Sequence, residues 1–323
     1  MKTVQKIVIS VCVMLTLQAQ AEVGPHNATS LMGPEIQTAQ HGRQVSFVSP
    51  DAAINSLVDA IRQGNQIKMR RVLGETAIPA VYLSDRVLNN MSNEHFLRAF
   101  DEKHSIEFIG MDKGILLIGN EEWSLPFPLR RVGSRWVFDE VAGVREWQNR
   151  RIGSDEIAAI QVSLAYADAQ REYVLQDRNS DGLLEYAQKI ASTPGLHNGL
   201  YWKTTDDEPL SPMGQAFADA HEDGARRMPG ASGHAFHGYY FRILTAQGTS
   251  APGGSHSYLV KERMIGGFAL IAYPESYGMS GVKSFIISHQ GIVYSKDLGV
   301  KTKLLASKMM LYDPDVTWTK ESD

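Results

Sequence analysis

The apolar residues of this chain change their spacing twice, from a helical period to a strand period, and this change limits the folds that the chain can adopt. In "SFVSPDAAINSLVDAIRQGN", Ile54, Leu57, Val58 and Ile61 repeat at three- and four-residue intervals, as one face of a helix does. Short runs such as "KGILLIG" and "RWVFDE" follow, separated by turn-forming residues, and these predict strands. Helices followed by an antiparallel meander predict an α+β domain.

The first of these helices has start and stop signals in the sequence. Ser49 stands at the N-cap position, and Pro50 follows where its missing N–H is tolerated. Asp51 complements the positive end of the helix dipole. Gly64 is placed to end the helix as a C-terminal glycine.

The second half repeats the order of helix and then strands. The segment "SDEIAAIQVSLAYADAQREYV" predicts a long helix capped by Ser154, after a linker near residues 145–153. The runs "HGYYFRILTA", "GGFALIAYP", "VKSFIIS" and "GIVYSKD" predict an antiparallel sheet, and "KLLASKMMLYD" a closing helix. The predicted fold class is therefore α+β with two domains. Residues 44–147 would form helices with a curved antiparallel sheet, and residues 148–323 a long helix on an antiparallel sheet.

The first 21 residues have the three parts of a secretory signal peptide. Lys2 and Lys6 give a positive start, residues 7–17 form an apolar run, and residues 19–21 form an A-x-A cleavage site. The apolar run is too short to cross a hydrocarbon core of roughly 30 Å. We therefore expect cleavage after Ala21 and a periplasmic location, with residues 22–43 as a flexible leader because they show no sustained period.

Composition excludes several classes of function for the cleaved chain. The only cysteine, Cys12, lies in the predicted signal, so no disulfide or thiol chemistry is expected. Removal of Lys2 and Lys6 changes the formal net charge from -4 to -6. With no basic stripe to neutralise phosphates, a nucleic-acid partner is not expected. No later apolar run is long enough to predict a transmembrane segment.

The segment "DRNSDGLLEYAQK" is the one candidate metal site in the sequence. Asp177, Asn179 and Asp181 take the first, third and fifth positions of an EF-hand-type calcium loop, and a glycine follows at the sixth. Glu185 falls at the ninth position. The twelfth position, where a bidentate acid is normally found, holds Gln188, which has neither the charge nor the two-oxygen grip of a carboxylate. A looser calcium site built from Asp177, Asn179, Asp181 and Glu185 is therefore one interpretation.

The alternative interpretation of this segment is a polar turn. Asp and Asn side chains accept hydrogen bonds from nearby backbone N–H groups, and Asp181 would start a helix in "LLEYAQKI". The sequence leaves both possibilities open. Elsewhere it shows no nucleophile elbow and no phosphate loop, so it predicts no catalytic residue and no other cofactor.

Several motifs together resemble a bacterial exported family of unknown function, the family numbered 2950. They are "FVSPDAAINSLVDAIRQGN", "FPLRRVGSRWVFDEVAG", "RRIGSDEIAAI", "GLYW", "SPMG", "GYYFRILTAQGTSAPGGSHSYLV", "GGFALIAYPESYGMSGVKSFIISHQGIVYSKDLG" and "DPDVTW". The resemblance covers nearly all of the chain after the predicted signal. It implies export and a shared two-part fold, but no established activity and no catalytic residues.

Two further resemblances concern shape. The order of elements in 44–147 resembles the cone-shaped nuclear transport factor 2-like fold, in which a curved sheet wraps a long helix. The second half resembles the globular part of type IV pilin-like (pseudopilin) proteins, in which a long helix packs on an antiparallel sheet. No hydrophobic membrane helix directly precedes Ser154. The resemblance therefore implies a pilin-like head that does not polymerise as pilins do.

These observations predict a non-enzymatic periplasmic module that binds an envelope protein or takes part in envelope assembly. The alternative is a small-ligand carrier or an enzyme with a pocket in the N-terminal domain, because cone-shaped folds often enclose one. A buried Asp, His or Tyr inside that domain would favour the alternative, whereas an apolar interior would favour the binding module. Fold class alone does not decide between them.

Overall fold

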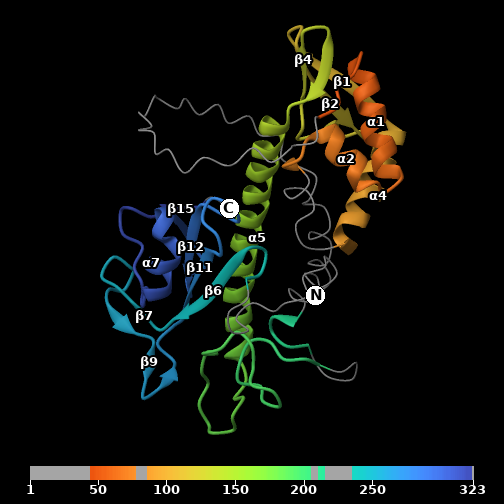
Figure 1. Ribbon diagram of the computed structural model, residues 1–323. Coiled ribbons are helices and arrows are strands. Elements are labelled where there is room, and N and C mark those ends of the chain that lie inside the picture. Colours follow the sequence, from red (N-terminus) through yellow and green to blue (C-terminus); the bar gives the residue numbers. More distant parts are fainter. Residues whose placement is uncertain (1–43, 78–85, 205–209, 215–234, 322–323) are drawn as a thin grey trace. The chain divides into compact units, whose positions relative to one another are not determined.

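The structure, a computed structural model, describes residues 44–77, 86–204, 210–214 and 235–321 (Figure 1). The predicted signal and leader, residues 1–43, lie outside the described residues. The chain forms two compact units. Of the described residues, the first unit takes 44–77 and 91–144, and the second takes 86–90 and 145–321. Each unit combines helices with antiparallel strands, so the predicted α+β class is confirmed. In the described part of the chain, no helix has both the length and the apolarity needed to span a membrane.

The first unit packs helices against an antiparallel sheet with the order β1-β2-β4-β5, in which β3 pairs with β2. Its helices are α1 (Pro50–Arg62), α2 (Gln66–Leu73) and most of α4 (Arg86–Glu102). Its strands are β1 (His104–Ile109), β2 (Lys113–Ile118), β3 (Trp123–Ser124), β4 (Leu129–Val132) and β5 (Arg135–Phe138).

Helix α1 begins where the sequence predicts. The Ser49 hydroxyl accepts a hydrogen bond from the backbone N–H of Ala52 at 3.1 Å, and Pro50 is the first helical residue. Ile54, Leu57 and Val58 are buried on the face that the apolar spacing indicates. The predicted cap and the predicted core face of this helix are both confirmed.

The second unit contains a five-stranded antiparallel sheet with the order β15-β13-β12-β11-β6. These strands are β6 (Tyr239–Leu244), β11 (Ala269–Pro274), β12 (Lys283–Ser288), β13 (Val293–Asp297) and β15 (Thr319–Lys320). Smaller sheets join β14 (Leu311–Tyr312), β7 (Ala246–Gln247) and β8 (His256–Ser257), and pair β9 (Leu259–Val260) with β10 (Arg263–Met264). The helices are η2 (Gly299–Lys301), α7 (Thr302–Lys308) and the greater part of α5 (Glu140–Tyr173).

Helix α5 is longer than the sequence predicts. It runs without interruption from Glu140 to Tyr173, so the expected linker near 145–153 is helical and the predicted start at Ser154 is wrong. The carboxylate of Asp139 accepts a hydrogen bond from Ala142 N at 3.1 Å and caps the true start. Asp139 followed by Glu140 was the signal in the sequence, since acidic residues favour a helix N-terminus.

The core of the second unit is built around β11, which is buried at all six positions. One face of the sheet presents Tyr240 and Arg242 to α7. The Arg242 guanidinium donates to the Ala306 carbonyl at 2.8 Å and to the Met309 carbonyl at the end of that helix. The apolar stripe of α5, which includes Tyr166, belongs to the same core, and the Tyr166 ring meets Phe268 edge-on at 5.6 Å.

One hydrogen-bonded network crosses this core. The Tyr166 hydroxyl donates to the Ala269 carbonyl at 3.2 Å. The Gln170 amide nitrogen donates to the Tyr166 hydroxyl at 3.0 Å and to the Ala187 carbonyl at 2.8 Å, and the Gln170 amide oxygen accepts from Ala187 N at 2.8 Å. Both side chains are fully buried. The network therefore joins α5, β11 and the segment around Ala187 where water cannot replace a lost partner.

Candidate functional site

The loop at 177–182 is a tight turn organised by Asp177. One oxygen of its carboxylate accepts hydrogen bonds from Asn179 N and Asp181 N, both at 3.3 Å, and the other accepts from Gly182 N at 2.7 Å. Ser180 and Gly182 have positive φ angles of 59° and 85°, which turn these N–H groups toward the carboxylate. Both oxygens of Asp177 are therefore occupied by the loop's own backbone, as in an Asx-type turn.

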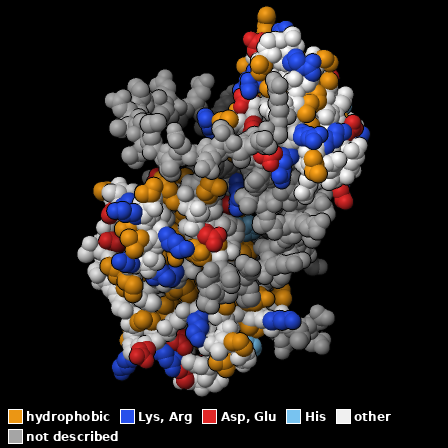
Figure 2. All heavy atoms as spheres, in the orientation of Figure 1, with side chains coloured by type: hydrophobic (Ala, Val, Ile, Leu, Met, Phe, Trp, Pro, Cys, Tyr) orange, Lys and Arg blue, Asp and Glu red, His pale blue; other side chains and the backbone are white. Residues whose placement is uncertain are grey.

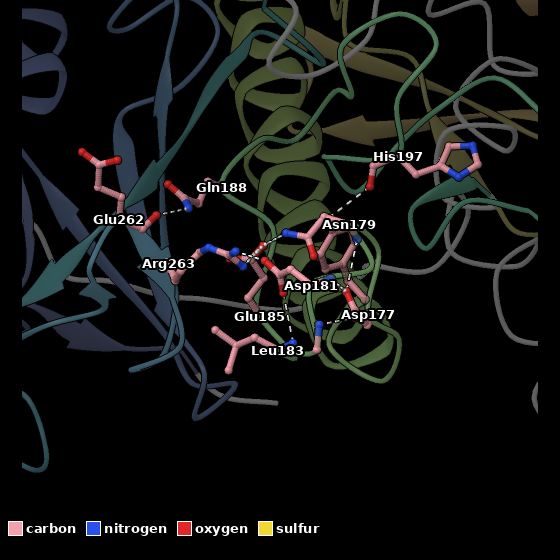
Figure 3. A network of polar contacts seen from close by, with 11 residues as sticks. Asp177, Asn179, Asp181, Leu183, Glu185, Gln188, His197, Glu262 and Arg263 are labelled. Carbon is pink, nitrogen blue, oxygen red and sulfur yellow. Dashed lines mark hydrogen bonds and ion pairs between the residues drawn. The ribbon is translucent and has the colours of Figure 1, made fainter.

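A single arginine holds the other carboxylates of the loop (Figure 3). The Arg263 guanidinium, on β10, forms an ion pair with Asp181 and a second, at 3.2 Å, with Glu185. The Asn179 amide nitrogen also donates to Glu185, at 3.0 Å. Burial, followed by the charge of Asp177, raises the pKa of the Glu185 carboxyl. Arg263 thus provides the positive charge that this acidic group needs.

The β9–β10 hairpin that carries Arg263 is attached to the segment after the loop at two more points. The Gln188 side chain donates to the Glu262 carbonyl at 2.7 Å, and Tyr186 N donates to the Met264 carbonyl at 2.8 Å. Lys261 and Glu262, at the hairpin turn, have φ angles of 48° and 65°. A turn with two left-handed residues matches the twist of paired strands but is unfavourable for residues other than Gly, Asn or Asp. The contacts across to Gln188 and Tyr186 help to hold this hairpin in place.

The structure joins Asn179 to Glu185 by a hydrogen bond and places Arg263 between Asp181 and Glu185. Residues 183–190 form no helix, so the predicted helix in "LLEYAQKI" is wrong, and this loop has no exiting helix of the EF-hand type. Within the described ranges, no three His, Cys, Asp or Glu side chains are grouped so as to hold a metal ion. In this conformation calcium would have to replace the ion pairs of Arg263. The calcium site stays a prediction.

Thermal unfolding tests the predicted calcium site directly. If Asp181 and Glu185 hold calcium, millimolar calcium will raise the wild-type melting temperature above its value in EDTA, because a ligand bound only by the native state stabilises that state. Each kcal/mol of binding corresponds to about 2–4 °C in a domain of this size. The variant Asp177→Ala/Asp181→Ala is the control and should not respond. Equal wild-type melting temperatures in calcium and in EDTA would rule the site out.

Replacing Arg263 with Met is expected to lower the free energy of unfolding by about 2 kcal/mol, because it leaves two partly buried carboxylates without their cation. Side chains of this ion-paired group are only 19–33% exposed. Urea denaturation measures the loss. The control is Arg70→Met, which removes the more exposed ion pair with Glu75 and should cost less than about 1 kcal/mol. Equal losses in the two variants would contradict the role assigned to Arg263.

Asp155, on α5, is a partly buried carboxylate of the second unit with a raised pKa. Its Oδ2 atom is buried with no hydrogen bond, 3.6 Å from Arg151 Nε. A side chain at Gly238 would meet this oxygen at 2.9 Å and the Ser280 Cβ at 2.6 Å, so these groups are closely packed. Burial raises the pKa of Asp155 to about 6, and Arg151 opposes the shift. The fold therefore favours the protonated acid.

Asp155→Asn is expected to stabilise the protein at pH 8 and to have little effect at pH 4. The folded-state pKa of about 6 lies above the ordinary value of 3.8, so the stabilisation from the protonated group is complete below pH 4 and is lost as the pH rises through 6. The gain at pH 8 should be about 2–3 kcal/mol. Urea denaturation of both proteins between pH 4 and pH 8 measures the difference. A difference that does not change with pH would refute the assignment.

A second candidate site is a set of exposed apolar side chains on η2, on α7 and in the segment after α7. We use "apolar face" for the exposed side chains of Val300, Leu304, Leu305, Met310, Leu311 and Val316. Met310 is 62% exposed and Val300 is 85% exposed. Next to them lies a depression of about 430 Å³ lined by Lys296, Leu298, Lys308, Met309, Met310, Leu311, Asp313, Asp315 and Trp318.

The two acidic residues of this depression already accept hydrogen bonds from nearby backbone N–H groups. The Asp313 carboxylate accepts from Ser250 N at 2.7 Å, and Asp315 accepts from Thr317 N at 2.8 Å. Hydrogen bonds from Thr317 lower the pKa of Asp315. The two acids therefore serve nearby backbone groups. Lys296 Nζ lies 5.7 Å from the Trp318 ring centre, so the lining of the depression pairs a cation with an aromatic ring.

One of these two features has a signal in the sequence. "KLLASKMML" holds more apolar residues than one face of a seven-residue helix can bury, which is a signal for the apolar face. Nothing near Arg263 in the sequence indicates its role, because its partners lie 78 or more residues away.

The fold and its surfaces define a protein of two α+β units with no recognisable catalytic arrangement among the described residues. The chain belongs to the family described as "Protein of unknown function (DUF2950)", whose model matches residues 44–321. The match spans both units, as the motifs quoted above imply. No curated protein and no solved structure matches the chain.

Proposed function

We propose that this protein is an exported, non-enzymatic binding module that docks an envelope protein through the apolar face of its second unit. The observation that carries the proposal is the group of large apolar side chains left in solvent beside the 430 Å³ depression. Contiguous exposed apolar residues with a polar rim are typical of interaction sites. Scattered single apolar residues would need no such explanation.

The composition of the first unit's interior favours this function over the carrier or enzyme. In the part of that unit that the structure describes, the buried side chains are all apolar. They are Pro50, Ala53, Ile54, Leu57, Val58, Ala60, Met69, Val72, Leu73, Ala77, Phe100, Leu116, Ile118, Leu125, Pro126, Phe127, Pro128, Leu129, Trp136, Val137 and Phe138. None is Asp, His or Tyr. A ligand or reaction site needs convergent polar groups, so this interior supports packing rather than chemistry.

The second unit's long helix beside an antiparallel sheet is compatible with the pilin-like resemblance. We include in the proposal that this unit acts as a head that presents the apolar face. The charges on the face indicate the partner's chemistry. Lys301, Lys303 and Lys308 surround the exposed Leu304 and Leu305, so the segment that docks there should combine apolar and acidic residues.

Export is supported by the signal-like residues 1–21 and is tested separately. We expect the protein in the periplasmic fraction of its own cells, with an N-terminus at Glu22. Fractionation followed by N-terminal sequencing measures both. Recovery of the uncleaved chain in the cytoplasm would refute the export part of the proposal, whatever the apolar face binds.

Photo-cross-linking in the protein's own cells tests the docking part. A photoreactive amino acid replacing Met310 should give one defined adduct with a partner, and the same probe replacing Ile67, an exposed residue of α2, should not. Leu304→Asp should abolish the adduct, because a charge opposes burial of this surface. An adduct that persists in Leu304→Asp, or that also forms from position 67, would contradict the proposal.

A further inference from the structure

Two hairpin ends lie side by side at one end of the first unit's sheet. The first joins β1 to β2 through residues 110–112, and the second joins β4 to β5 through residues 133–134. Arg131 N donates to the Asp112 carbonyl at 2.8 Å, which links the two ends directly. Gly110 and Gly133 have φ angles of 66° and 61°, so each turn is closed by a glycine that can adopt them. We call residues 108–113 and 130–135 the hairpin tips.

The hairpin tips expose apolar side chains that the unit's core does not use. Met111 is 77% exposed, and Phe108, Ile109 and Val132 are between 50% and 54% exposed. Phe108 contacts the Trp136 ring edge-on at 6.1 Å, but half of it remains in solvent. Four large apolar residues are exposed on the two hairpin tips, which the hydrogen bond from Arg131 N to the Asp112 carbonyl joins, whereas isolated exposed residues are ordinary.

Basic residues surround this group. Lys113, Arg130, Arg131 and Arg135 are all exposed, and they come from both tips. The acids nearby are fewer: Glu107 and Asp112 are exposed, and Asp139 lies 3.6 Å from Arg130. The tips are therefore basic on a chain whose formal net charge is -4. Figure 2 shows hydrophobic and basic side chains together at the end of the first unit where β1, β2 and β4 meet in Figure 1.

We propose that the hairpin tips bind the surface of an anionic lipid bilayer. Apolar side chains on projecting turns can enter the boundary between headgroups and acyl chains, and flanking cations attract the anionic headgroups. Each Lys or Arg near such a surface contributes enough for about a fivefold change in affinity. The apolar side chains lie on hairpin ends rather than along a helix face, and this placement favours a lipid surface over a protein segment. This inference concerns a different surface and does not depend on that docking site.

Vesicle co-sedimentation of the protein purified after expression tests the inference. The wild type should sediment with vesicles of phosphatidylglycerol and remain in the supernatant with vesicles of phosphatidylcholine. Arg130→Glu/Arg131→Glu should weaken binding by about tenfold or more, because each of the two lost cations contributes about a fivefold change in affinity. Met111→Asp/Val132→Asp should also weaken it, because it places charges where apolar groups would enter the bilayer.

The matched control is Ile67→Asp/Arg71→Glu, which makes the same kinds of change on exposed residues of α2. All variants share one N-terminus, so any contribution of residues 1–43 to binding cancels between them. Circular dichroism and thermal unfolding confirm that each variant is folded. The inference is overturned if the wild type binds neither vesicle or both equally. It is also overturned if the tip variants bind as the control does, or if the tips bind a protein and not phosphatidylglycerol.

Discussion

Gly143→Ala is expected to lower the free energy of unfolding by about 2–3 kcal/mol, although alanine is the better helix former. Gly143 lies inside α5, where helix propensity alone predicts a gain of up to about 1 kcal/mol. An added Cβ would lie 2.0 Å from Cδ1 of Phe127 and 2.6 Å from its Cε1. Phe127 is 2% exposed, so its ring cannot move aside without disturbing the core of the first unit. The steric cost therefore exceeds the propensity gain.

Gly153→Ala in the same helix is the matched control. No heavy atom lies within 4 Å of the position that its Cβ would take. This substitution should leave stability unchanged or raise it by up to about 1 kcal/mol. If the packing at Phe127 is correct, urea denaturation shows a lower free energy of unfolding for Gly143→Ala and no loss for Gly153→Ala. A stabilising effect of Gly143→Ala would show that the first unit does not pack as described.

Gln170→Leu is expected to cost about 3–5 kcal/mol, although leucine is the more hydrophobic residue and of similar size. The substitution removes the amide that pairs with both the N–H and the carbonyl of Ala187, each at 2.8 Å. Both backbone groups would remain in a buried setting without a partner, at about 1–3 kcal/mol each. The Tyr166 hydroxyl would also lose a donor.

Gln161→Leu provides the comparison, because Gln161 is an exposed residue of the same helix. Its replacement should change the free energy of unfolding by less than about 0.5 kcal/mol. Hydrogen exchange gives a second measurement, since loss of the network should speed exchange at Ala187 more than in β11. If Gln170→Leu is as stable as the wild type, the network does not hold the segment around Ala187 to the core.

Local signals predicted the parts of the fold that depend on neighbouring residues. The cap at Ser49, the apolar face of α1 and the order of helices and strands in the first half follow from spacing and turn chemistry, and the structure confirms them. In the second half the predicted closing helix is wrong at its end, because α7 stops at Lys308 and strands β14 and β15 follow it. The prediction of a linker near 145–153 also rested on local signals, and it was wrong. Gly153 and Ser154 resemble a break and a cap, but the helix runs through both positions.

In the loop at 177–182, the sequence predicted the polar residues but not the cation that pairs with them. The oxygen-bearing residues of "DRNSDG" predicted a tight turn or a cation site, and the carboxylate of Asp177 does organise a turn. The cation beside Asp181 and Glu185 is Arg263, which the chain supplies from a hairpin far along the sequence. An acidic loop looks the same in sequence whether a metal or an arginine neutralises it, because the residue types record only its charge.

The sequence by itself determined the α+β class, the helix face of α1 and the family, because each depends on residues within a few positions of one another or on motif order. For the loop at Asp177 it left two possibilities, a turn and a cation site. Tertiary structure decided the partner of the acidic loop, the continuity of α5, and which apolar residues stay in solvent. These depend on contacts between residues distant in sequence. Burial and pairing are settled only when such segments meet, so Met111 and Met310 could be recognised as surface residues only in the folded chain.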